Sequence, residues 1–226
     1  MPPPVKAVVF DLYGTLLRIR RAFLHKSAPA VLGVEAARWM GLVREALLTR
    51  SFEGRAEFAR FICERLAPGR PDVEERVRAM VDDEVESVET IEGVLSLLAF
   101  LRRRGYALGV LSNLSSVHKD PLRRLGLLPL FDATGFSCDA GMVKPEPRFY
   151  LDLCARVGVP PEETLMVGDS LRNDVRAPRA LGMRALRVFA ADGLPATAML
   201  GFVSLAPGSE LVPLLQDGDL LNLGGR

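Results

Sequence analysis

Residues 5–16 read VKAVVFDLYGTL, an apolar run that ends at an aspartate and continues into a glycine-containing segment. The run from Val5 to Phe10 shows no regular polar alternation, which is typical of a strand buried on both faces of a parallel sheet. Asp11 therefore falls at the carboxyl end of this strand, where ligands bind in open parallel sheets. The stretch predicts an α/β protein with a polar site at one edge of its sheet.

Further apolar runs repeat this arrangement along the chain. A helical pattern separates most of them, and each such pattern stops at a glycine. The alternation of strand, helix and glycine is typical of a doubly wound parallel sheet. The expected strands are residues 107–111, 164–167, 185–189 and 202–205, with a shorter one near 133–137, and the expected helices are 94–104, 121–125, 146–157 and 174–181.

Residues 20–89 interrupt this alternation, because they contain no convincing strand pattern. Apolar residues recur there every three or four positions, which indicates helices that pack through one face. We therefore expect a helical domain at 20–89, inserted into a core domain made of residues 1–19 and 90–226. The expected helices of the insertion are about 21–32, 35–50, 53–67 and 72–88.

The composition is that of an ordinary globular protein, with 49% hydrophobic residues, 25% charged residues and a net charge of +1. The small net charge gives no support for a nucleic-acid partner. Three cysteines and two histidines offer little material for a disulfide framework, a zinc site or a Ser-His-Asp triad. No signal peptide or membrane span is expected, so a cytoplasmic location without membrane partners is predicted. The oligomeric state is left open.

Polar residues follow three of the expected strands. Asp11 follows the first, Ser112 and Asn113 follow the strand at 107–111, and Asp169 follows the strand at 164–167, with Asp174 five residues later. The three carboxylates converge on one edge of the sheet, where an oxygen-liganded cation such as Mg²⁺ would bind. The hydroxyl and amide groups at 112–113 suit an anionic oxygen.

Lys144 stands in the sequence VKPEP just before an expected helix. Its positive charge would counter negative charge that develops during a reaction. A carboxylate that is fixed beside a cation and faces a bound electrophile can attack it and form a covalent intermediate. Asp11 is therefore the candidate nucleophile, and Lys144 is the candidate for stabilising its reaction.

The order of these motifs resembles the haloacid dehalogenase-like hydrolase superfamily. The matching segments are D-x-x-G-T at 11–15, S-N at 112–113, K-P at 144–145 and G-D-S-x-x-N-D at 168–174, and the likeness extends over about residues 5–215. The resemblance implies a Rossmann-like core with an α-helical cap inserted after the first motif. That position agrees with the helical insertion expected at 20–89.

The resemblance also implies roles for individual residues. It makes Asp11 the nucleophile and Lys144 the second catalytic residue, which steadies both the nucleophile and the substrate anion. The implied substrate is a small phosphorylated metabolite. The substrate-binding residues would be Tyr13, Thr15, Ser112 and Asn113, and the Mg²⁺ ligands would be Asp11, the backbone carbonyl of Tyr13, Asp169 and Asp174.

The chain departs from the phosphatases of this superfamily at Tyr13, where they carry a second aspartate as general acid and base. A tyrosine, with an ordinary pKa of about 10, does not replace a carboxylate near neutral pH. The pattern D-x-Y-G-T is instead typical of 2-haloacid dehalogenases, as is Tyr150 six residues after Lys144. The segment around Arg44 also faintly resembles a dehalogenase cap segment.

The fourth motif favours the phosphatase interpretation, because its two carboxylates would repel the nucleophile without a cation. Two alternatives stay open. One is a metal-independent 2-haloacid dehalogenase that uses Asp11 as its nucleophile, and the other is a low-activity or non-catalytic binding protein on the same fold. The sequence does not identify the substrate. The cap residues considered for substrate contact are Arg18, Arg20, Arg44 and residues 51–55.

Overall fold

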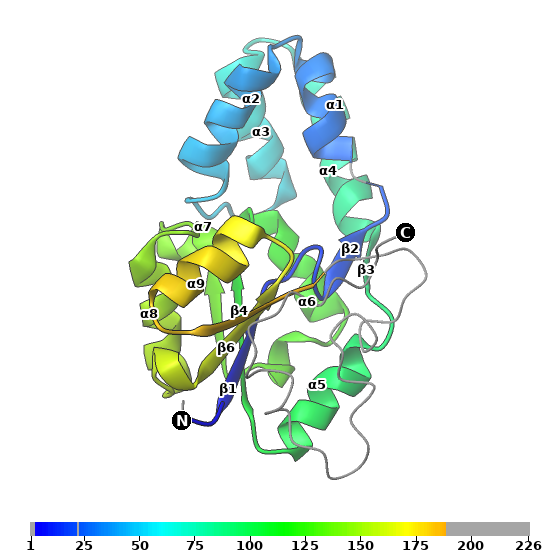
Figure 1. The fold of residues 1–226 in the computed structure, drawn as a ribbon. Coiled ribbons are helices and arrows are strands. Elements are labelled where there is room, and N and C mark those ends of the chain that lie inside the picture. The colour runs from blue at the N-terminus through cyan, green and yellow to red at the C-terminus, as the bar shows by residue number, and fades with distance from the viewer. Residues whose placement is uncertain (1–2, 22, 189–226) are drawn as a thin grey trace, which may run out of the picture.

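The computed structural model describes residues 3–21 and 23–188 of the chain. Within these residues the molecule has two lobes, a sheet lobe and a helical lobe that stands above one edge of the sheet (Figure 1). The strand expected at 202–205 lies outside the described residues, as does the end of the strand expected at 185–189. No helix in this part of the chain is long and apolar enough to cross a membrane.

The sheet lobe is built on five parallel strands in the order β5-β4-β1-β6-β7. The central strand β1 is completely buried, and its last residue, Phe10, lies opposite Val110 of β4 and Val167 of β6. The residues that follow these three strands therefore meet at one edge of the sheet, and the predicted α/β Rossmann-like fold is confirmed. The strands are β1 (Ala7–Phe10), β4 (Ala107–Ser112), β5 (Ala133–Phe136), β6 (Thr164–Gly168) and β7 (Arg184–Arg187).

Helices cover both faces of this sheet because successive side chains of a strand point to opposite faces. Val9 packs with Phe149 on one face, whereas Val8 and Phe10 pack with Leu98 on the other. Helices α8 and α9 lie on the first face and α5 on the second (Figure 1). The helices of this lobe are α5 (Val94–Arg103), α6 (Asp120–Arg124), α7 (Ser137–Ala140), α8 (Pro147–Val157) and α9 (Ala177–Ala180), with short turns η2 (Ser116–Lys119), η3 (Leu128–Leu130), η4 (Pro161–Glu163) and η5 (Leu171–Arg176).

The helical lobe has a hydrophobic core of its own, which contains Trp39, Phe58 and Ile62. Helix α4 packs against both α1 and α3. The helix expected at 35–50 is instead α2 followed by a π-helical turn that ends at Leu47. The elements of this lobe are α1 (Phe23–Leu32), α2 (Ala36–Leu42), η1 (Val43–Leu47), α3 (Arg55–Leu66) and α4 (Pro71–Glu86).

Two short antiparallel strands, β2 (Leu17–Ile19) and β3 (Val88–Thr90), connect the lobes. The expectation that residues 20–89 contain no strand is therefore wrong at the end of that range, where β3 begins at Val88. Three residues are too few to show a strand pattern in the sequence. This pair lies where the boundaries of the helical insertion were predicted.

A buried polar network also ties the helical lobe to the sheet lobe. Glu84 of α4 is completely buried, and its carboxylate accepts a hydrogen bond from the backbone N–H of Leu24 in α1 at 2.7 Å. Its other oxygen lies 3.0 Å from Nε2 of His118, which belongs to the sheet lobe. Nδ1 of His118 lies 2.7 Å from the hydroxyl of Ser115. One carboxylate thus holds α1, α4 and the segment after β4 together.

Replacing Glu84 with alanine is expected to lower the free energy of unfolding by about 3 kcal/mol, because it leaves buried partners without their acceptor. Urea denaturation followed by circular dichroism measures the loss. Glu75→Ala is the matched control, since Glu75 is exposed on the same helix. It is expected to change stability by less than about 0.5 kcal/mol. Equal effects of the two variants would contradict a linking role for Glu84.

Candidate active site

The side chains predicted to form the site do meet at the carboxyl edge of the sheet. Asp11 directly follows β1 and is 7% exposed. The Lys144 ammonium lies 2.7 Å from Oδ1 of Asp11 and also 2.7 Å from Oδ1 of Asp174. Burial alone would lower the pKa of Lys144, but the charges of Asp11 and Asp174 outweigh this effect. The pKa is therefore raised, and the ammonium stays charged. The site therefore contains a buried cation held between two anions.

Three carboxylates share this small space. Oxygens of Asp11, Asp169 and Asp174 all lie within 4.8 Å of one another. Burial, followed by the charges of Asp11 and Asp174, raises the pKa of Asp169 to about 6. Burial also raises the pKa of Asp174, although Lys144 opposes the shift. The single ammonium thus leaves the cluster with excess negative charge.

This arrangement fits a divalent cation. Oxygen ligands of Mg²⁺ lie about 2.0–2.1 Å from the ion, which places them roughly 3–4 Å from one another. The three carboxylates need little adjustment to reach that spacing. A bound cation would also offset the carboxylate repulsion that, after burial, raises the pKa of Asp169. The ligand role of the Tyr13 carbonyl stays a prediction.

Ser112 and Thr15 contact the candidate nucleophile from two sides. The Ser112 hydroxyl lies 3.3 Å from Oδ1 of Asp11, and the Thr15 hydroxyl lies 3.5 Å from Oδ2. Both residues are almost completely buried. Their hydroxyls are therefore placed to bind Asp11 or an anion beside it.

Asn113 has a function that the sequence did not indicate. Its side-chain Oδ1 accepts a hydrogen bond from the backbone N–H of Lys144 at 2.7 Å, and its Nδ2 donates to the Lys144 carbonyl at 3.0 Å. The side-chain amide is thus engaged in fixing the backbone that carries Lys144. Because Nδ2 carries a second N–H, the expected contact of Asn113 with the substrate anion stays a prediction.

The loop that carries Asp174 is fixed by hydrogen bonds that the sequence did not reveal. The backbone N–H of Ser170 donates to Oδ2 of Asp174 at 2.9 Å, and the Ser170 hydroxyl accepts from the N–H of Asn173 at 3.2 Å. The Tyr150 hydroxyl donates to the Asn173 carbonyl at 2.5 Å. Tyr150 therefore supports this loop from α8, and burial raises its pKa.

Two glycines allow the carboxylates to approach the backbone. A Cβ atom on Gly168 would lie 2.4 Å from Cγ of Asp174, and one on Gly14 would lie 2.5 Å from Oδ2 of Asp169. Gly14 also has a φ of +86°, a backbone conformation that residues other than glycine rarely adopt. The glycine of D-x-x-G-T is thus required both by the backbone and by the neighbouring carboxylate.

Replacing Gly14 with alanine is expected to displace Asp169 and weaken Mg²⁺ binding by about 10–100-fold, the usual effect of disturbing a metal ligand's support. Isothermal titration calorimetry with Mg²⁺ measures the change. Gly105→Ala separates displacement from backbone strain, because Gly105 has a φ of +83° but no atom within 4 Å of an added Cβ. Equal loss of Mg²⁺ affinity in both variants would refute the steric explanation.

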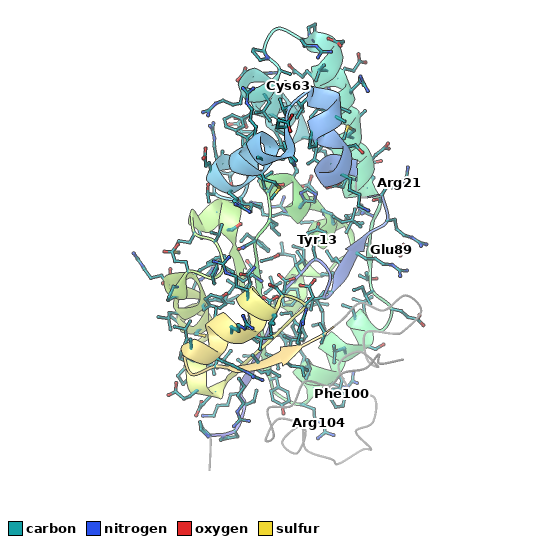
Figure 2. The ribbon with its side chains drawn as sticks, turned by 45° about the horizontal axis from the view of Figure 1, so that its top comes forward. Tyr13, Arg21, Cys63, Glu89, Phe100 and Arg104 are labelled. Carbon is teal, nitrogen blue, oxygen red and sulfur yellow. The ribbon has the colours of Figure 1, made fainter. Side chains whose placement is uncertain are left out.

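Tyr13 lies between the two lobes, as Figure 2 shows. Its hydroxyl donates to the backbone carbonyl of His118 at 2.8 Å, and the two rings meet edge to face at 5.6 Å. Burial, and then the charge of Glu84, raises the pKa of Tyr13 above its ordinary value. The tyrosine therefore stays a neutral hydrogen-bond donor, and it does not replace the carboxylate that phosphatases carry at this position.

The structure shows the surroundings of the cap residues considered for substrate contact, and that contact stays a prediction. Arg18 and Arg20 form ion pairs with Glu89, near the connecting strands. Arg44 is exposed. At the two ends of the candidate segment 51–55, the Ser51 hydroxyl donates to Asp139 at 2.7 Å, and Arg55 pairs with Asp82, Glu86 and Asp120.

Comparison with known proteins gives consistent results. A family model described as haloacid dehalogenase-like hydrolase matches residues 5–182. Phosphoserine phosphatase of Thermus thermophilus is 37% identical over 162 residues, which cover 69% of this chain and only 59% of that protein. Phosphoglycolate phosphatase of Nitrosospira multiformis is 32% identical over 197 residues, which cover 80% of this chain and 82% of that protein.

A similar solved structure is that of a HAD phosphatase from Thermococcus onnurineus. It has a TM-score of 0.59 and 26% sequence identity, and the match covers 84% of this chain and 89% of that one. The fold, the order of the motifs and the family match agree with one another. The chain belongs to the haloacid dehalogenase-like hydrolase family.

Proposed function

We propose that the protein is a Mg²⁺-dependent phosphatase that hydrolyses a small phosphorylated metabolite through an aspartyl-phosphate on Asp11. The observation that carries this proposal is the clustering of Asp169 and Asp174 around Asp11, with oxygens within 4.8 Å. Beside a nucleophile that needs no metal, these two carboxylates would add more negative charge than the single Lys144 ammonium offsets. They are useful when a divalent cation binds, and the phosphatase names of the sequence relatives support the same reaction.

In the proposed reaction the phosphoryl group binds against Ser112, Asn113 and Lys144. Asp11 attacks phosphorus in line, the bond to the leaving oxygen breaks, and the resulting aspartyl-phosphate is hydrolysed by water to release inorganic phosphate. Lys144 offsets the charge on the phosphoryl oxygens. Mg²⁺, held by Asp11, Asp169 and Asp174, would supply further charge neutralisation. The helices of residues 20–89 would act as a cap over this site.

The second candidate is a metal-independent 2-haloacid dehalogenase, which Tyr13 favours. In that reaction Asp11 attacks carbon 2 of the substrate, halide leaves, and water hydrolyses the ester. Arg44, whose segment resembles a dehalogenase cap segment, is exposed, and its contact with substrate stays a prediction. A low-activity or non-catalytic binding protein on the same fold is the third candidate.

The experiment that tests the proposal measures phosphate release from 4-nitrophenyl phosphate with Mg²⁺ and with excess chelator. Turnover that requires Mg²⁺ is the expected result. Halide release from 2-chloropropionate that persists in chelator would instead establish the dehalogenase. Absence of both activities would favour the non-catalytic protein.

A further inference from the structure

A cavity of about 190 Å³ lies between the lobes, next to the candidate active site. Apolar side chains from the helical lobe form most of its wall. They come from α1, α2, η1 and α3, and they belong to the separate hydrophobic core of that lobe. Examples are Leu24, Trp39, Val43, Leu47 and Phe58.

The cavity borders the site through two residues. Tyr13, two positions after Asp11, lines it, and so does Asn113, which holds the backbone of Lys144. A phosphoryl group placed between Asp11 and Lys144 would therefore have this cavity beside it. The part of the substrate attached to that phosphoryl group is the natural occupant.

The described part of the wall provides no oppositely charged side chain for a charged group. Among the described residues that line the cavity there is no arginine, lysine, aspartate or glutamate. Five polar side chains line the cavity, those of Tyr13, Trp39, Asn113, Ser115 and His118. The Tyr13 hydroxyl donates to the His118 carbonyl, Asn113 exchanges two hydrogen bonds with the backbone of Lys144, and the ring nitrogens of His118 contact Ser115 and Glu84. A carboxylate or ammonium group would lose its hydration there without a compensating ion.

The volume sets the size of the occupant. An apolar cavity of about 150 Å³ is large enough to hold benzene. The present cavity, at about 190 Å³, has room for one six-membered ring with a short connecting chain, or for an aliphatic group of similar volume.

On the basis of the proposed phosphatase function, we propose that the substrates are phosphate monoesters whose leaving group is apolar, uncharged and about one ring in size. The chain would then differ in specificity from the relatives named for phosphoserine and phosphoglycolate. The leaving groups of those two compounds carry a carboxylate, which the apolar wall would exclude.

The test compares 2-phenylethyl phosphate with phosphoserine and 2-phosphoglycolate in the presence of Mg²⁺. All three are primary alkyl esters, so differences in kcat/KM report mainly on the binding of the leaving group. We expect 2-phenylethyl phosphate to be preferred by at least about 100-fold, because the others must bury an unpaired charge. Equal values, or a preference for either charged ester, would overturn the proposal.

A variant of the cavity wall gives a second measurement. Leu48 lines the cavity and is only partly buried, so Leu48→Arg places a cation there at a position with some room. It should reduce the preference for 2-phenylethyl phosphate over 2-phosphoglycolate by about tenfold or more. Leu95→Arg, at a position 51% exposed on α5, is the matched control and should leave the preference unchanged. An unchanged preference in a folded Leu48→Arg protein would show that the leaving group binds elsewhere.

These results also distinguish failure of the proposed phosphatase function from failure of the inference about the leaving group. If neither the three esters nor 4-nitrophenyl phosphate releases phosphate, the phosphatase function and this inference are both overturned. Mg²⁺-dependent release with the opposite order of preference would overturn the inference alone.

Discussion

Replacing Asp11 with asparagine is expected to lower kcat for phosphate release by at least about 10⁴-fold, as removal of a covalent nucleophile does in other hydrolases. The amide is a poor nucleophile, and Lys144 loses one of its two carboxylate partners. Mass spectrometry of the wild-type protein, quenched during turnover, should detect a phosphoryl group on Asp11. The same measurement on the variant should detect none.

Asp152→Asn is the matched control for this substitution. Asp152 is exposed on α8, so the control removes the same charge without touching the site. It is expected to keep wild-type kcat. Turnover by Asp11→Asn at a rate close to that of the control would rule out the covalent mechanism.

Replacing Lys144 with methionine is expected to cost about 3 kcal/mol of unfolding free energy near neutral pH, because it leaves two buried carboxylates without their cation. The 2.7 Å contacts to Asp11 and Asp174 are both lost. The variant should also lose most of its activity, since the charge on the phosphoryl group is no longer offset. Thermal unfolding and kcat measure the two effects.

The loss of stability should depend on pH. The pKa of Asp169 is already raised to about 6 by burial and by its two carboxylate neighbours, and removing Lys144 takes away a charge that lowers it. A carboxyl whose pKa is raised in the folded state destabilises the protein fully above that pKa, and the penalty fades as the pH falls towards its ordinary value of about 4. The deficit of Lys144→Met relative to wild type should therefore be large at pH 7.5 and smaller at pH 5.

Two further measurements sharpen this prediction. Mg²⁺ should restore part of the lost stability at pH 7.5, because it binds the same carboxylates. Lys6→Met is the control, since Lys6 forms an exposed ion pair with Glu163 and should lose less than about 1 kcal/mol. A deficit of Lys144→Met that grows as the pH falls would contradict the electrostatic explanation.

The sequence alone determined the architecture of the sheet and the place of its polar residues. The run before Asp11 predicts a buried strand because it is apolar on both faces, and β1 is completely buried. Ser112 ends β4 and Asp169 follows β6, and both strands pair with β1. Because parallel strands end at the same edge of a sheet, the meeting of these residues with Asp11 could be predicted without coordinates. The roles proposed for these residues rest on the family motifs and stay predictions.

Only the tertiary structure decided what surrounds those residues. The Asn113 amide binds the backbone of Lys144 across 31 residues, His118 meets Glu84 across 34, and the Tyr13 hydroxyl reaches the carbonyl of His118 across 105. No local period or motif encodes such pairs, because they depend on how the helical lobe is placed against the sheet lobe. The apolar cavity has the same origin. Its wall combines helix faces that the sequence shows only as packing surfaces, and their position beside Tyr13 and Asn113 follows from the packing of the two lobes.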